Sequence, residues 1–137
     1  MKRILVVDDD GGVRSTLQVW LEREGFDVVI AEDGASSIAI IESSRIDLVI
    51  IDIFMPGMGG LEAIEALHRS APEVPIIAIS GFMFSHSFGA APDFLGMAAK
   101  VGVAYCLHKP FRPHQLMTVV EACLGRPALS ASQAAVA

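Results

Sequence analysis

Aspartates follow two runs of aliphatic residues in this sequence, and their placement suggests a cation site. Residues 8–10 are all aspartate and come directly after the run 4–7, and Asp52 comes after the run 48–51. A short apolar run that ends at turn residues is typical of a strand buried on both faces, as in a parallel sheet. The carboxyl ends of such strands share one edge of the sheet, where open α/β sheets bind their ligands. Carboxylates gathered there repel one another, and a hard divalent cation such as Mg²⁺ relieves the repulsion.

Two further polar side chains stand where later apolar runs end. Ser80 follows the run 74–79, and Lys109 comes just after the run 103–107. Once a cation offsets the repulsion among the acids, Asp52 can attack a phosphoryl group and hold it as an acyl phosphate. The Lys109 amine and the Ser80 hydroxyl would stabilise the phosphoryl oxygens. Each residue alone has an ordinary explanation, such as a helix cap, a turn or a solvated charge. Their joint placement favours phosphoryl chemistry.

Strand and helix patterns alternate along the whole chain. We expect strands over residues 3–7, 27–31, 48–51, 74–79 and 103–107. We expect helices over residues 13–24, 35–42, 61–71, 92–101 and 116–124. This alternation predicts an α/β fold, a (βα)5 doubly wound, five-stranded parallel sheet with right-handed crossovers and helices on both faces. We expect one domain over residues 1–125 and a disordered tail over residues 126–137, which are mostly small and rich in alanine.

Composition excludes several functional classes. The chain has 137 residues and a net charge of −6, which argues against direct nucleic-acid binding because that needs a basic surface. The apolar runs are far shorter than the ~20 residues that span a bilayer, so we expect no membrane insertion. The apolar run after Lys2 and Arg3 is also too short for a signal peptide, so we expect a cytoplasmic protein.

Four motifs make residues 2–125 resemble a response-regulator receiver domain of two-component signalling. The motifs are Val7-Asp8-Asp9, Asp52 with Met55-Pro56-Gly57-Met58-Gly59-Gly60, Ile79-Ser80-Gly81 and Lys109-Pro110-Phe111. The resemblance implies the flavodoxin-like strand order 2-1-3-4-5 of the single-domain chemotaxis regulators. It implies a phosphorylation-dependent signalling domain rather than an enzyme. The phosphoryl group would come from a histidine kinase or a phosphotransfer protein, and output would pass to a downstream effector from a monomer or weak homodimer.

The resemblance also implies a role for each matched residue. Asp52 would be the phosphoacceptor. Mg²⁺ or Mn²⁺ would be bound by Asp52, by Asp9 directly, by Asp8 mostly through water, and by the backbone carbonyl of Phe54. 

Two more matched positions would act on the phosphoryl group. Ser80 would hydrogen-bond a phosphoryl oxygen and reorient on phosphorylation, and Lys109 would pair with the phosphoryl group. The Lys109–Pro110 peptide bond would be cis.

Two features depart from the family pattern. The switch aromatic of the family stands three residues before the lysine, where this chain has Cys106; Tyr105 is one residue earlier and is expected on the opposite face of its strand. His108 is likewise expected to point away from the site. Residues 82–91 are an insertion rich in phenylalanine, expected either to cover the neighbouring helix or to form a docking surface or lid.

Two other functions compete with a phosphorylated receiver. One is a binding module that keeps the fold and works without phosphate. The other is a phosphatase of the haloacid-dehalogenase type, with Asp8 as nucleophile and Asp10 as acid/base, because residues 8–13 also resemble the loop of that family. We expect a stand-alone regulator or relay intermediate.

Overall fold

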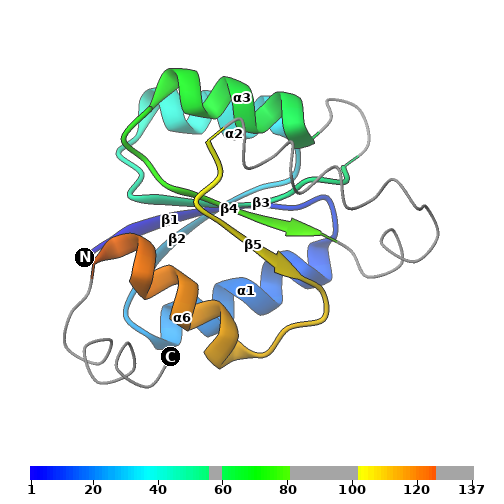
Figure 1. The fold of residues 1–137 in the computed structure, drawn as a ribbon, viewed down its shortest axis with the longest axis vertical. Coiled ribbons are helices and arrows are strands. Elements are labelled where there is room, and N and C mark those ends of the chain that lie inside the picture. The colour runs from blue at the N-terminus through cyan, green and yellow to red at the C-terminus, as the bar shows by residue number, and fades with distance from the viewer. Residues whose placement is uncertain (56–59, 81–101, 126–137) are drawn as a thin grey trace.

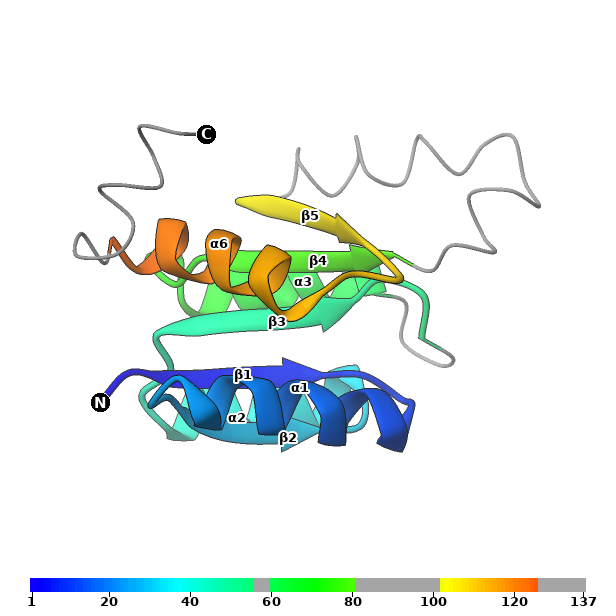
Figure 2. The same cartoon turned by 90° about the horizontal axis from the view of Figure 1, so that it is seen from below.

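The sheet has the predicted composition and order. The computed structural model describes residues 1–55, 60–80 and 102–125. Its strands are β1 (Arg3–Val7), β2 (Asp27–Ala31), β3 (Leu48–Asp52), β4 (Ile76–Ser80) and β5 (Tyr105–His108). They form one sheet in the order β2-β1-β3-β4-β5 (Figure 2), and every neighbouring pair is parallel. The predicted flavodoxin-like fold is therefore confirmed.

Helices cover both faces of this sheet. The described helices are α1 (Gly11–Arg23), α2 (Gly34–Ser43), α3 (Gly60–Ser70) and α6 (Pro113–Leu124). Figure 1 shows α2 and α3 on one face and α1 and α6 on the other, and we call these the α2/α3 face and the α1/α6 face. The helix predicted over 92–101, the insertion 82–91 and the tail 126–137 lie outside the described residues.

The two faces are packed by two separate apolar clusters. Alternate residues of β3 divide between them, since Val49 and Ile51 pack with α3 on the α2/α3 face. Leu48 and Ile50 pack with α1 and α6 on the other face. All four residues are fully buried, as the continuous apolar run predicts for a central strand of a parallel sheet. Asp52 therefore lies at the carboxyl end of a strand that is buried on both faces.

The predicted element boundaries shift by one to three residues for local reasons. β4 begins at Ile76 because Pro75 has no N–H for the ladder, although the Pro75 carbonyl still accepts from the N–H of Val49 at 3.0 Å. α1 begins at Gly11, two residues earlier than its apolar stripe, because the side chain of Asp10 caps it.

Candidate functional site

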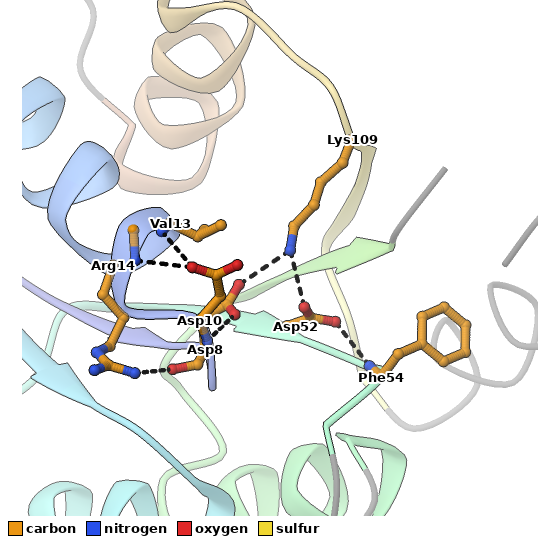
Figure 3. A network of polar contacts seen from close by, with 8 residues as sticks. Asp8, Asp10, Val13, Arg14, Asp52, Phe54 and Lys109 are labelled. Carbon is orange, nitrogen blue, oxygen red and sulfur yellow. Dashed lines mark hydrogen bonds and ion pairs between the residues drawn. The ribbon is translucent and has the colours of Figure 1, made fainter. Parts of the chain in front are cut away.

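Lys109 bridges the acids at the ends of β1 and β3. Its Nζ donates to Asp52 Oδ2 at 2.9 Å and to Asp8 Oδ2 at 3.2 Å. The Asp8 side chain is 1% exposed, the Asp52 side chain 7% and the Lys109 side chain 25%. Figure 3 shows the lysine reaching across the strand ends toward both carboxylates. Three residues predicted to meet at the carboxyl edge of the sheet are thus brought together.

The surroundings of Asp8 and Lys109 shift the pKa values of both side chains. Burial raises the pKa of Asp8, with the charge of Asp52 adding to the rise, and the hydrogen bond from the Asp10 N–H and the ammonium of Lys109 only partly oppose it. Burial alone would lower the pKa of Lys109, but its hydrogen bonds and charge interactions with Asp52 and Asp8 outweigh that effect and raise it. The lysine therefore stays charged, and two buried carboxylates share one cation.

Asp10, the last residue of the acidic triplet, has a structural role. Its Oδ1 accepts from the backbone N–H of Gly12 at 2.8 Å and of Val13 at 3.2 Å, so it caps α1. Asp8 is held in place by its neighbours, since its Oδ1 accepts from the Asp10 N–H and its carbonyl accepts from Arg14. The helix-cap explanation thus applies to Asp10, and Asp8 and Asp9 remain candidates for binding a metal ion.

The carboxylates of Asp8, Asp9 and Asp52 form a group that could hold a metal ion. One oxygen from each lies within 4.8 Å of the others. Asp8 and Asp52 are buried, and Asp9 is exposed. Carboxylate oxygens are the ligands that Mg²⁺ prefers, usually two or so with water and phosphate oxygens completing its shell. Burial, with a smaller contribution from the charge of Asp52, raises the pKa of Asp8, and a divalent cation beside it would favour the charged carboxylate. The residues therefore fit the predicted ion.

Phe54 holds the other side of the Asp52 carboxylate. Its backbone N–H donates to Asp52 Oδ1 at 2.8 Å, so the two oxygens of Asp52 have different partners. The Phe54 ring packs against the apolar cluster of the α2/α3 face, and Figure 3 shows it directed away from the carboxylates. The part predicted for the Phe54 carbonyl as a metal ligand stays a prediction.

Ser80 is at the same edge of the sheet but has a different partner. Its Oγ lies 3.0 Å from Nδ1 of His108. Within the part of the chain that the structure describes, its hydroxyl has no hydrogen bond to Asp8, Asp52 or Lys109. The structure thus brings together the acids and Lys109, and places Ser80 at the strand end next to them.

His108 lies on the opposite face of the sheet from the acids, as predicted, but the prediction missed its contact with Ser80. The two are register partners in the parallel strands β4 and β5, so their side chains stand on the same face of the sheet. Alternation does place Lys109 on the opposite face from His108, but its long side chain reaches over the strand ends. The contact between His108 and Ser80 follows from the register between β4 and β5, which the pattern of a single strand does not reveal.

The two predicted switch positions lie on opposite faces of β5. Cys106 packs with the cluster of the α2/α3 face, the face of Ser80. Tyr105 pairs in register with Ile77, which belongs to the cluster of the α1/α6 face, and it is 42% exposed. The family's aromatic position is thus occupied by a thiol, whose pKa burial raises. The predicted cis peptide bond between Lys109 and Pro110 is present.

A groove opens beside the cluster on the α1/α6 face. It has a volume of about 490 Å³, and Asp10, Lys109 and the Trp20 and Phe111 rings are among its lining residues. The two rings meet edge to face with centroids 6.2 Å apart. The groove runs from Lys109 along α1, so the cluster adjoins a concave surface.

Comparison with known proteins decides the family. A family model of the response regulator receiver domain matches residues 4–121. The chain belongs to this family. The haloacid-dehalogenase alternative is therefore wrong, and Asp10, its acid/base, is the cap of α1.

Relatives of this receiver domain include regulators and isolated domains. The DNA-binding response regulator MtrA of Mycolicibacterium paratuberculosis is 34% identical over 125 residues, which is 91% of this chain and 52% of that protein. A receiver domain protein of Methanospirillum hungatei superposes with a TM-score of 0.83 at 30% identity, covering 91% of this chain and 94% of that one. The regulator TrrA of Thermotoga maritima, in complex with Mg²⁺ and BeF, superposes with a TM-score of 0.76 at 33% identity, covering 90% and 100%.

The chain spans only part of the length of the curated relatives that it matches. It spans 17% of one, the sensor kinase/phosphatase CqsS of Vibrio cholerae, and about half of MtrA. In the described part of the receiver domain, every helix falls short of the length and apolarity needed to cross a membrane.

Proposed function

We propose that this receiver domain works by reversible phosphorylation of Asp52, with Mg²⁺ or Mn²⁺ as the required ion. The supporting observation is the position of Asp52 at the end of the central strand, with Lys109 Nζ 2.9 Å from one oxygen and the Phe54 N–H 2.8 Å from the other. A carboxylate held from both sides is a positioned nucleophile. TrrA, a relative that binds Mg²⁺ and BeF, supports the same chemistry here.

The proposed step forms one bond and breaks one. An oxygen of Asp52 attacks phosphorus, and the bond from phosphorus to the donor atom breaks, so the donor leaves with that electron pair. Lys109 lies where its ammonium can pair with a phosphoryl oxygen. The metal ion, held by Asp8, Asp9, Asp52 and the Phe54 carbonyl, would neutralise the negative charge that the acids present to an incoming phosphoryl group. 

The donor and the output are proteins in this proposal. A histidine kinase or phosphotransfer protein supplies the phosphoryl group, and an effector protein reads the change. The net charge of −6 favours a protein over a nucleic acid as the direct partner of this chain, although MtrA is described as DNA-binding. We propose a cytoplasmic monomer or weak homodimer that assists its own phosphorylation and dephosphorylation.

Intact-mass spectrometry after incubation with acetyl phosphate and Mg²⁺ tests the proposal. The wild type should gain the mass of one phosphoryl group, and chelation of the metal ion should prevent the gain. Asp52→Asn should abolish it, whereas Asp10→Asn, at the helix cap, should retain it. If the wild type gains no mass, the phosphate-independent binding module becomes the better explanation, and the thiol at position 106 would fit it.

A further inference from the structure

Ser80 and His108 form a pair whose function the acid cluster does not explain. The Ser80 side chain is buried, with 2% of the residue exposed, and its Oγ lies 3.0 Å from His108 Nδ1. A buried hydroxyl without a partner costs free energy. Among the described residues, the hydrogen-bond partner of this hydroxyl is His108, so the imidazole determines the direction in which the hydroxyl points.

The pair lies on the opposite face of the sheet from the acids. Ser80 continues the series of Ile76 and Ala78, which pack on the α2/α3 face. Asp52 continues the series of Leu48 and Ile50, which pack on the α1/α6 face. For its hydroxyl to reach a phosphoryl group on Asp52, the Ser80 side chain must therefore turn toward the strand end and away from His108.

The hydrogen bond to His108 opposes that rotation of the Ser80 side chain, whichever ring nitrogen of His108 carries the proton. If the hydroxyl donates to Nδ1, its one proton is unavailable to a phosphoryl oxygen. If Nδ1 carries the proton and donates to Oγ, the bond still fixes the side-chain rotamer. Cys106, on the same face and at the position of the family's aromatic switch, has no ring that could follow the hydroxyl when it moves.

We propose that His108 is a positioning residue, which holds the Ser80 hydroxyl in a resting orientation and releases it when a phosphoryl group is present on Asp52. The inference rests on the proposed phosphorylation of Asp52. It involves no covalent change at Ser80 or His108. The net strength of a single hydrogen bond corresponds to about a two- to tenfold change in an equilibrium constant, and this is the expected size of the effect.

Binding of beryllofluoride in the presence of Mg²⁺, measured by calorimetry, tests the release. Beryllofluoride mimics a phosphoryl group on a carboxylate. His108→Leu removes the hydrogen bond but keeps the bulk of the side chain, so it should tighten binding by about two- to tenfold. His108→Asn places an amide where Nδ1 stood and should bind like the wild type. In a Ser80→Ala background, His108→Leu should have no further effect.

A spectroscopic measurement on the protein without metal or phosphate tests the pair itself. Ser80→Ala should shift the ¹⁵N resonance of His108 Nδ1, and circular dichroism should verify that each variant is folded. An unchanged resonance would overturn the proposal. So would unchanged or weaker beryllofluoride binding by His108→Leu in a protein whose wild type binds it, and then the phosphorylation of Asp52 would stand. No binding and no phosphorylation of the wild type would overturn both.

Discussion

Replacement of Lys109 by methionine tests whether the acids depend on its charge. The Nζ of Lys109 lies 2.9 Å from Asp52 and 3.2 Å from Asp8, and both acids are buried. Methionine has a similar length without the charge. Lys109→Met would therefore leave two buried carboxylates side by side with no cation between them when metal is absent.

The expected destabilisation is a substantial part of the total. Removal of one partner from a buried ion pair costs about 3–5 kcal/mol. Because a quarter of the Lys109 side chain is exposed, solvent screens part of the interaction and we expect a loss of about 3 kcal/mol in the free energy of unfolding. Added Mg²⁺ should stabilise Lys109→Met by about 1.4 kcal/mol at ten times its dissociation constant, and the same Mg²⁺ concentration should stabilise the wild type by less, because Lys109 already offsets the charge of the acids.

The loss should also depend on pH. Burial already raises the pKa of Asp8, and Lys109 opposes the rise, so the pKa should increase further in Lys109→Met. A carboxyl whose folded pKa lies above its unfolded value penalises the fold at high pH, and the penalty fades as the pH falls through the folded pKa. The difference in stability between Lys109→Met and the wild type should therefore shrink toward acidic pH.

Urea denaturation with a chelator, and again with Mg²⁺, measures these effects. Arg69→Met is the matched control, because Arg69 pairs with Glu65 within one exposed helix surface and such pairs contribute about 0.3–0.5 kcal/mol. The claim that the buried acids depend on a nearby positive charge would be refuted by either of two results. One is that Lys109→Met loses no more stability than the control, and the other is that Mg²⁺ stabilises it no more than the wild type.

Three further comparisons probe other parts of the structure. Asp10→Ala should lower the free energy of unfolding by about 1 kcal/mol through loss of the α1 cap, whereas the exposed Asp9→Ala should not lower it; equal urea midpoints would contradict the capping role. By thermal melting, Gly102→Ala should destabilise more than Gly125→Ala. Both glycines have positive φ, which costs about 1–2 kcal/mol for alanine, but among the described residues the added Cβ at 102 would meet His68 at 2.9 Å, whereas the one at 125 would meet none within 4 Å. Partial burial raises the pKa of the Cys123 thiol to about 11 from 9.0, so alkylation of Cys123 near neutral pH should be about a hundredfold slower in the folded than in the urea-unfolded protein. Equal rates would refute this raised pKa.

The arrangement of the acids and Lys109 followed from sequence because it depends on strand ends alone. Two aliphatic runs that end in aspartate are sufficient to place Asp8 and Asp52 at one edge of a parallel sheet. The lysine motif after the last run then supplies the cation. The predicted meeting of these side chains is confirmed by the hydrogen bonds of Lys109.

The Ser80–His108 contact could not be predicted in the same way. Alternation within β5 separates His108 from Lys109, but it does not reveal which residue of β4 lies opposite. That depends on the register between two strands 28 positions apart in the chain, which is set by packing of the whole sheet. The sequence also could not show which of the three adjacent aspartates caps α1. Each is an acceptable helix cap, and only the backbone geometry selects Asp10.

The site also has a consequence for how the chain acquires its activity during synthesis. Asp8 and Lys109 are 101 positions apart, so the lysine emerges from the ribosome long after the acids. Until β5 pairs with β4, the two carboxylates at the ends of the central strands β1 and β3 lack their cation. Contacts of such long sequence separation form slowly, so competence to signal should be among the last properties that a nascent chain gains.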